Sequence, residues 1–428
     1  MKVPDEIKNI NWVHGFVCDI YGRMRTLTFP PKTLINEGET GIGIDGSSIK
    51  GFAEVEDSDI LGIPELDRSI ILPTRKEALI PLQTHRSDGS LLPTDPRNII
   101  LKVEKSIKSA GFTPFIRPEM EFFVFRKDED PLNIHNPLGT RYFLPPSFDD
   151  IAEYRSELAS VLRRVGIGVR YHHHENAYGQ IEIELPFVEG AIRTGDYILI
   201  HKYLSRMVAR NYDFRVTYMP KPIPDEAGSG MHMHMYLEKS GKNAFYDEND
   251  KLGLSQTARY FIGGILEHVS AFTAITNPTV NSYKRLAGGL EAPAYIAWGN
   301  RNRSALLRVP AGKSNPDVEI RNPDPSANPY LAEAVILHAG LHGIKKKIEP
   351  GDPIEENIYH MTKNKRKKLG IGKLPMNLGD AVEELKSDEV VQKALGPIYD
   401  VFVTIKEDEW YRFIGNTSPW EIERYFDV

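Results

Sequence analysis

The chain of 428 residues is predicted to have an α+β fold, with a small β-rich domain followed by a large domain of mixed strands and helices. Residues 12–73 read as short strands separated by Gly, Asp and Pro. Residues 91–97 contain two prolines and read as a linker. Beyond the linker, strand-like and helix-like segments alternate. We therefore expect domains at residues 12–95 and 96–428.

Periodicity of the apolar residues predicts the individual elements in order. Strands are expected at 13–18 and 25–29, where apolar runs are bounded by turn residues. Helices are expected at 99–110, 151–165 and 196–212, where apolar residues recur at helical spacing. We find no internal repeat.

Composition and charge exclude several classes of function. The net charge is −6, which gives no general attraction to nucleic acid or to an anionic membrane. The basic run at 363–368 is interpreted as a solvated helix face. The single cysteine, Cys18, excludes an intramolecular disulfide and a multi-cysteine zinc site. The polar amino terminus and the lack of long apolar stretches predict a cytoplasmic protein without membrane contact.

Four predicted strands carry ionisable residues at every second position. Because successive side chains of a strand point to opposite faces, each segment has one apolar and one ionisable face. The segments are 118–125 (PEMEFFVF) with Glu119 and Glu121, 179–185 (GQIEIEL) with Glu182 and Glu184, 231–235 (MHMHM) with His232 and His234, and 318–321 (VEIR) with Glu319 and Arg321.

The chemistry of these faces predicts a metal cleft. A single such strand would be read as amphipathic with a wet face, but the four faces contain only carboxylate, imidazole and guanidinium groups. If they converge, the carboxylates repel one another and lose hydration unless cations lie among them. Oxygen ligands with an occasional imidazole suit Mg²⁺ or Mn²⁺. This pattern does not by itself name a reaction.

A nucleotide, if one binds, must be held without a Walker A loop. Residues 311–314 (AGKS) end like that motif, but Leu307 stands where its leading glycine should be. Arginines that are suited to phosphate and carboxylate occur instead in one Asn-, Gly- and Pro-rich region. They are Arg285, Arg303, Arg308 and Arg321.

Seven motifs in one order resemble the type I glutamine synthetases, and the resemblance runs from about residue 12 to residue 421. The motifs are 45–52 (DGSSIKGF), 173–182 (HHENAYGQIE), 228–232 (GSGMH), 277–286 (NPTVNSYKRL), 291–293 (EAP), 302–304 (NRS) and 328–330 (NPY). The resemblance implies a β-grasp amino-terminal domain and a large domain with an antiparallel sheet or half-barrel that forms a metal funnel. It also implies a homododecamer of two hexameric rings, with each site between neighbouring subunits, and a nitrogen-regulatory protein as a partner.

The same resemblance implies ligands for two to three Mg²⁺ or Mn²⁺ ions and for ATP. One metal set matches Glu121, Glu175 and Glu182, and a second matches Glu119, His232 and Glu319. Glu184 matches no ligand and is interpreted as structural. Gly228, Arg285 and Arg321 match positions that bind glutamate, and Arg321 also faces developing charge. Arg303, Arg308 and His234 match positions that face the ATP phosphates.

The activity implied is ATP-dependent ligation of ammonia to the γ-carboxyl of glutamate through a γ-glutamyl phosphate. Ammonium must be captured and deprotonated, which requires an anionic pocket with a base. Asp45, Asp59, Tyr142 and Glu175 match that pocket, and Asp45 is the expected base, supplied by the adjacent subunit. Glu291 matches the flap residue that closes over the intermediate.

The sequence departs from the family pattern at several positions near the expected site. Ala227 stands for an Asn, Asp317 for an Arg directed at phosphate, and Tyr236 for a Ser. The flap reads AGGL at 287–290 in place of Val-Pro-Gly-Tyr. Three interpretations therefore stay open: a glutamine synthetase, a γ-glutamyl-amine ligase that accepts a polyamine, ethanolamine or similar organic amine, and a non-catalytic relative.

Overall fold

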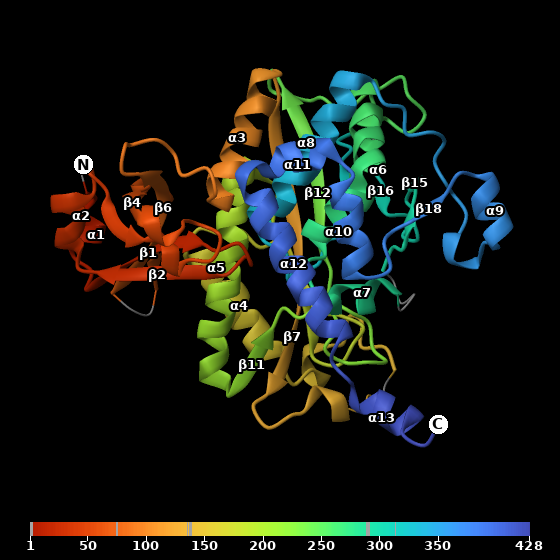
Figure 1. Cartoon of the computed structure of the whole chain (residues 1–428), viewed down its shortest axis with the longest axis horizontal. Helices are drawn as coiled ribbons and strands as arrows, with labels where there is room; N and C mark the ends of the chain where they lie inside the picture. The colour runs from red at the N-terminus through yellow and green to blue at the C-terminus, as the bar shows by residue number, and fades with distance from the viewer. Residues whose placement is uncertain (1–2, 74–75, 135, 137–138, 288–291, 313) are drawn as a thin grey trace.

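The computed structural model describes residues 3–73, 76–134, 136, 139–287, 292–312 and 314–428. Figure 1 shows a small amino-terminal part beside a much larger body, and the chain passes from one to the other through the segment before α3. The expected α+β class is confirmed, since both parts combine sheets with helices. No helix in the described part of the chain is long and apolar enough to cross a bilayer.

The amino-terminal part is a six-stranded mixed sheet in the order β2-β1-β6-β4-β3, with β5 paired to β6. β1 runs parallel to β6, and the other neighbours are antiparallel. Short helices α1 (Asp5–Lys8) and α2 (Pro31–Glu37) accompany it. The strands are β1 (Trp12–Cys18), β2 (Met24–Phe29), β3 (Ile42–Asp45), β4 (Asp59–Pro64), β5 (Ile70–Leu72) and β6 (Glu77–Arg86).

The tight turn between β1 and β2 is organised by the buried carboxylate of Asp19. Its Oδ1 accepts hydrogen bonds from the backbone N–H groups of Tyr21 and Arg23 at 3.0 and 2.9 Å. Gly22 has φ +76°, and a Cβ there would lie 2.7 Å from the Cα of Asn328. A glycine is therefore required both by the turn and by its close approach to the large part. The strands predicted at 13–18 and 25–29 are confirmed.

Helix α3 (Pro96–Ser109) begins inside the predicted linker, at its second-last residue. The side chain of Asp95 caps it by accepting from the Arg97 N–H at 2.8 Å, and Pro96 occupies a position that needs no donor. Its buried face includes Ile100 and Val103. The helices expected at 99–110, 151–165 and 196–212 are confirmed as α3, α4 (Ala152–Arg164), and α5 (Ala191–Ala209) with a short 3₁₀ turn after it.

The large part is built on a curved ten-stranded sheet whose main path is β15-β16-β17-β12-β7-β9-β8. Its strands are β7 (Thr113–Arg126), β8 (Tyr171–His174), β9 (Gln180–Glu184), β10 (Val188–Glu189), β11 (Phe214–Thr217), β12 (Met231–Lys239), β13 (Lys242–Asn243), β15 (Trp298–Asn300), β16 (Leu307–Val309) and β17 (Val318–Ile320). A separate pair joins β14 (Tyr295–Ile296) to β18 (Gly372–Lys373). The four strands with ionisable residues at alternate positions are thus β7, β9, β12 and β17.

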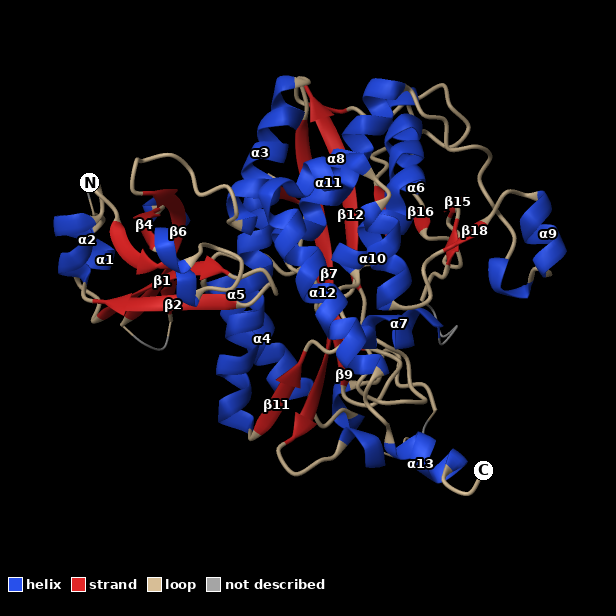
Figure 2. Ribbon diagram, in the orientation of Figure 1, coloured by secondary structure: helices blue, strands red, loops and turns tan. Residues whose placement is uncertain are grey.

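Helices cover one face of this sheet, and the hydrophobic core lies between the helices and the sheet. In Figure 2, α8, α10, α11 and α12 lie in front of the long strands β7 and β12. Helices α6 and α8 approach closely, because a Cβ on Gly264 would lie 2.7 Å from the Cα of Gly343. The helices of this region are α6 (Gln256–Thr276), α7 (Val280–Ala287), α8 (Pro329–Lys346), α9 (Lys363–Lys368), α10 (Leu378–Lys386), α11 (Glu389–Leu395), α12 (Tyr399–Ile414) and α13 (Pro419–Tyr425).

The alternation on β12 explains which face of the sheet is left for the site. Met231, Met233 and Met235 are fully buried in the core shared with the helices. Their burial contributes on the order of 1.5–3 kcal/mol each and fixes the strand's orientation, because a slip of one residue would bury the histidines instead. The intervening side chains therefore face away from the helices.

Candidate active site

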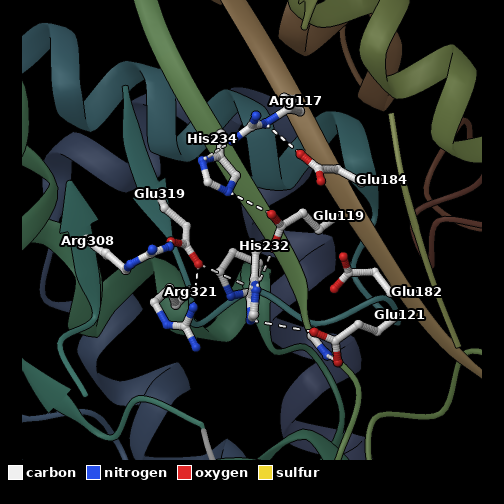
Figure 3. A network of polar contacts seen from close by, with 12 residues as sticks. Arg117, Glu119, Glu121, Glu182, Glu184, His232, His234, Arg308, Glu319 and Arg321 are labelled. Carbon is white, nitrogen blue, oxygen red and sulfur yellow. Dashed lines mark hydrogen bonds and ion pairs between the residues drawn. The ribbon is translucent and has the colours of Figure 1, made fainter. Parts of the chain in front are cut away.

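The strand register brings the ionisable faces together. β7 lies between β12 and β9, and β12 also pairs with β17, so the four strands are neighbours in one sheet. Directly opposed residues in a sheet have Cβ atoms about 5 Å apart. The opposed pairs are Glu119–His232, Glu119–Glu184, Glu121–Glu182 and His234–Glu319. Figure 3 shows these side chains directed toward one another from β7, β9, β12 and β17.

A cavity of about 1150 Å³ is lined by most of the predicted site residues. Glu319 lies behind this wall, 1% exposed, and contacts Arg308 and Arg321. The lining residues that were predicted from the sequence are Glu119, Glu121, Tyr142, Glu175, Glu182, Gly228, His232, His234, Arg285, Arg303, Arg308 and Arg321.

On one side of the cavity the carboxylates are balanced by protein cations. Glu119 contacts His234 Nε2 at 2.9 Å and His232 Nδ1 at 3.0 Å. Although burial opposes it, these two rings hold the pKa of Glu119 well below its ordinary value. Burial by itself would raise the pKa of Glu319, but the charges of Arg321 and then His234 lower this pKa to about 2.

On the other side the carboxylates are not balanced. Burial raises the pKa of Glu175 well above its ordinary value, and repulsion from Glu121 and Glu182 adds to the effect. Burial and repulsion from Glu119 and Glu121 do the same for the pKa of Glu182. His173 offers only partial compensation, with its ring nitrogens 3.4 Å from Glu175 and Glu182. A divalent cation would remove this repulsion.

The donor atoms fit such cations. Within the described part of the chain, three groups of possible ligand atoms in this region lie within 4.8 Å of one another. They are Glu119–His234–Glu319, His173–Glu175–Glu182 and Glu119–Glu182–Glu184. The groups contain carboxylate oxygens with one imidazole at most, which is the donor set that Mg²⁺ and Mn²⁺ accept.

The arginines of the cavity differ in what holds them. Arg285 is buried, and its guanidinium donates to the backbone carbonyls of Arg321, Asn322 and Pro323 at 2.8–3.3 Å. Burial lowers its pKa. The buried Nε atoms of Arg308 and Arg321 have no hydrogen-bond partner among the described residues. Unpaired buried donors are rare in folded proteins, so these two fit a site that is completed by an anion.

The four residues predicted to receive ammonium lie in two different places. Glu175 and Tyr142 line the cavity. Asp45 and Asp59 lie opposite each other on β3 and β4 of the small sheet and do not line it. The exposed Asp45 carboxylate accepts hydrogen bonds from Ser47 and Ser48, and these lower its pKa. Glu291, predicted to close over the site, lies outside the described residues.

Two departures from the family pattern have structural partners. Asp317 Oδ1 lies 2.7 Å from His234 Nδ1. Burial alone would lower the pKa of His234, but Glu119, Asp317 and Glu319 together raise it to about 10. The negative charge at Asp317 is thus directed at the His234 ring, whose Nδ1 also lies 2.7 Å from Arg117 Nη2, rather than into the cavity. Tyr236 stacks on Phe115 at 4.9 Å and acts in packing.

Sequence reasoning missed several polar residues of the cavity. Arg117 lies two residues before Glu119 on the same face of β7, and its Nε is 3.1 Å from Glu184 Oε1. This contact is compatible with the structural role expected for Glu184, although Glu184 also belongs to one of the three groups of possible metal ligands. Gln180 precedes Glu182 by two residues, and its Nε2 donates to Glu121 Oε2 at 3.1 Å. Extending the alternation by one step on β7 and β9 would have found both.

Comparison with known proteins identifies the family. The family model for the glutamine synthetase β-grasp domain matches residues 9–85, and the model for the glutamine synthetase catalytic domain matches residues 93–425. The chain is 42% identical to the glutamine synthetase of Thermotoga maritima, over 98% of this chain and 97% of that protein. It is 43% identical to the glutamine synthetase of Thermococcus kodakarensis, over 96% of this chain and 94% of that protein.

Solved structures agree with the sequence relatives. A structure of GmaS in complex with ADP superimposes with a TM-score of 0.90 at 30% identity and covers 98% of both chains. GmaS without ligand superimposes equally well. The β-grasp and funnel expectation for the fold is confirmed by these matches. From the cavity geometry, the two domain models and relatives at 42–43% identity, the chain belongs to the glutamine synthetase family.

Proposed function

We propose that this enzyme joins ammonia to the γ-carboxyl of L-glutamate at the expense of ATP and forms glutamine, ADP and phosphate. One observation carries the proposal: the cavity places a carboxylate-rich half beside an arginine-rich half within about 1150 Å³. The first half suits cations, and the second suits the anionic glutamate and triphosphate. Phosphoryl transfer between two anions needs this combination.

The arginine-rich half would bind the two substrates. Arg321 and Arg285, with the Gly228 backbone, are assigned to glutamate, and Arg303 and Arg308 to the ATP phosphates. His234, when protonated, would add a positive charge on the phosphate side. Support comes from the unpaired Nε atoms of Arg308 and Arg321, which already lack partners among the described residues.

The carboxylate-rich half would hold two to three Mg²⁺ or Mn²⁺ ions through Glu119, Glu121, Glu175, Glu182, His232 and Glu319. When bound, such ions neutralise phosphate charge in the transition state. His232 supports this assignment, since its ring is within 3.8 Å of Glu119, Glu121 and Glu319.

The reaction would proceed in two displacements. A γ-carboxylate oxygen of glutamate attacks the γ-phosphorus of ATP, ADP leaves, and γ-glutamyl phosphate forms. Ammonium then gives a proton to Asp45, and the resulting ammonia attacks the acyl carbon. The C–O bond to phosphate breaks, and the nitrogen gives its second proton to the leaving phosphate, which yields the amide and hydrogen phosphate. Arg321 would stabilise the oxyanion formed in the second step, and Glu291 would shield the intermediate from water.

The location of Asp45 and Asp59 outside the cavity supports a site shared between subunits. We infer that a neighbouring subunit supplies both residues to the pocket lined by Tyr142 and Glu175. Closed rings built from such head-to-tail interfaces agree with a dodecamer of two hexamers. A cytoplasmic location and a nitrogen-regulatory protein partner belong to the same proposal.

Transfer of isotope tests the chemistry directly. Glutamate labelled with ¹⁸O in its γ-carboxyl should pass one labelled oxygen to inorganic phosphate in each turnover, because the carboxylate oxygen leaves with the phosphate. The measurement is mass spectrometry of phosphate formed with ATP, Mg²⁺ and ammonium. Unlabelled phosphate together with glutamine formation would refute the acyl-phosphate step.

An organic amine is the second candidate for the acceptor, and one observation favours it. Tyr142 and Phe143, which are 44% and 61% exposed, line the cavity with Glu175 and stack at 4.1 Å. Exposed aromatic rings beside a carboxylate can hold an alkylammonium group. Comparing kcat/KM for ammonium, methylamine, ethanolamine and a diamine decides between the candidates, because the true acceptor should have by far the highest kcat/KM.

A further inference from the structure

A second cavity, of about 870 Å³, lies between the β1–β2 turn and the large part of the chain. Its described lining contains six basic side chains and one acidic one, in a protein whose net charge is −6. The basic residues are Arg23, Arg25, Lys202, Arg206, Arg210 and Lys406, and the acidic residue is Glu409. None of them belongs to the candidate active site.

Most of these cations have no carboxylate to balance them. Arg25 pairs with Asp19 at 2.7 Å, and Lys406 pairs with Glu409 at 2.8 Å. The other four basic side chains have no carboxylate within ion-pair distance in the described part of the chain. Lys202 is buried, whereas Arg23, Arg206 and Arg210 are exposed. Like charges that line one concave site raise the local attraction for anions.

Three of the cations form a stripe along the end of α5 and the start of the 3₁₀ turn that follows it. Lys202, Arg206 and Arg210 are spaced by four residues, which places them on one helix face, where like charges repel. The helix dipole favours positive charge near the carboxyl end, which stabilises Arg206 and Arg210. It does not explain why a lysine stands one turn earlier at position 202, where the side chain is only 7% exposed. Among the residues that the structure describes, the polar and aromatic partners of the Lys202 ammonium are the Ala327 carbonyl at 3.4 Å and the ring of Tyr218 at 5.5 Å.

The cavity wall is continuous with the catalytic site through residues 321–328. Ser326 and Asn328 line the cavity. Ser326 donates to Asp324, which also accepts from Asn277 Nδ2 at 3.0 Å. At the other end of the segment, the carbonyls of Arg321, Asn322 and Pro323 hold the guanidinium of Arg285.

We propose that this cavity binds a small anion with at least two negative charges, of carboxylate or phosphate type, and that its occupancy changes the affinity of the catalytic site for glutamate. The binding step follows from the uncompensated cations. The effect on glutamate follows from residues 321–328, which contact both sites, and only this part rests on the proposed function.

Binding is tested by titration calorimetry of the full-length protein without ATP, metal or glutamate. Succinate, 2-oxoglutarate, citrate, glycerol 3-phosphate and pyrophosphate serve as probes and separate carboxylate from phosphate ligands. At least one should bind at one site per chain. Lys202→Met and Arg206→Gln should each weaken binding about tenfold or more, whereas Lys363→Met on the exposed helix α9 should not.

Two results would overturn the binding step. One is the absence of saturable binding for every probe below roughly 10 mM. The other is unchanged affinity in folded Lys202→Met and Arg206→Gln proteins. Arg303→Ala provides the location control: binding that disappears in this variant belongs to the catalytic cavity and equally refutes the assignment.

A proton measurement adds a readout that a merely structural lysine would not give. Burial lowers the pKa of Lys202 to about 8, and Arg206 adds to this, while Cys18 and Asp324 oppose it. A bound anion favours the charged ammonium, so binding at pH 8 should take up protons, measured in two buffers of different ionisation enthalpy. The proton uptake should be lost in Lys202→Met. An anion that binds the wild-type protein at pH 8 without proton uptake would refute direct contact with Lys202.

The coupling step is tested by steady-state kinetics. A saturating anion should change the KM for glutamate at least about threefold in the wild type, and Lys202→Met should abolish the change. Binding that depends on Lys202 but leaves KM and kcat unaltered would refute the coupling. If the enzyme proved inactive as a ligase, the calorimetric experiment would still test anion binding, because it does not depend on ligase activity.

Discussion

The position of Asp45 outside the cavity leads to a quantitative complementation experiment. Asp45→Asn should form intact assemblies without ligase activity, because an amide cannot take the ammonium proton. The amide oxygen can still accept from the N–H and hydroxyl of Ser47, which now lie 3.0 and 2.7 Å from the carboxylate. Glu319→Ala should also be inactive, since it removes the carboxylate between Arg308 and Arg321.

Mixing the two inactive variants should restore activity to a calculable level. If each site combines Asp45 of one subunit with Glu319 of its neighbour, a random equal mixture gives an intact pair at about one quarter of the interfaces. Specific activity should therefore reach about 25% of wild type. Coexpression of the two chains with different tags, followed by glutamine assay and a mass-spectrometric check of the ratio, measures it.

A matched control removes the ambiguity of partial recovery. Asp57→Asn changes an exposed carboxylate of the same small part that has no assigned role. Mixed with Glu319→Ala, it should give about half of wild-type activity, because only Glu319 limits those sites. Mixed assemblies of Asp45→Asn and Glu319→Ala that show no recovery would refute the shared site, as would a fully active monomer.

Three further predictions concern stability. Mg²⁺ at about 100 times its dissociation constant should add ~2.7 kcal/mol to the free energy of unfolding over the EDTA-treated protein, and Glu182→Gln should lose most of this gain in thermal unfolding. Lys202→Met should raise the free energy of unfolding by roughly 3 kcal/mol at pH 7, because a pKa lowered from 10.5 to about 8 destabilises the fold below pH 8. That gain should fade between pH 8 and 10.5 in urea unfolding; a constant gain would disprove its electrostatic origin. Arg97→Met should cost about 3 kcal/mol in the same assay, since it removes the 2.8 Å partner of the buried Asp196, and a loss below about 0.5 kcal/mol would contradict this.

The ionisable strand faces could be predicted because a strand has a period of two and its composition can be read directly. That they line one cavity was only a conditional expectation from the sequence, since convergence requires the order β17-β12-β7-β9. This order depends on pairings between residues far apart in the chain, such as Glu119 with Glu184, 65 residues away, and with His232, 113 residues away. Local periodicity carries no information about such pairs.

The partner of Asp317 shows the same limit at one residue. The family resemblance implies an arginine at this position, so the sequence suggests a charge reversal and a weakened phosphate site. Whether the carboxylate faces the phosphate depends on the β12–β17 register, which places His234 beside it at 2.7 Å. The basic stripe at the end of α5 was missed for a related reason: this helix is buried on most sides and mixes polar with apolar residues, so its periodicity does not mark Lys202.

The uneven charge balance of the catalytic cavity has a consequence for how its ligands bind. Around Glu119 and Glu319 the protein itself supplies compensating cations, so that wall is already ordered before any ion arrives. Among the described residues, His173 is the one cationic partner within ion-pair distance of Glu175 and Glu182, at 3.4 Å from each. A divalent cation therefore gains most at the Glu175–Glu182 side, where it relieves repulsion rather than displacing arginines. That side is also where ammonium is expected to enter, so occupancy by the metal sets the charge that the incoming cation meets.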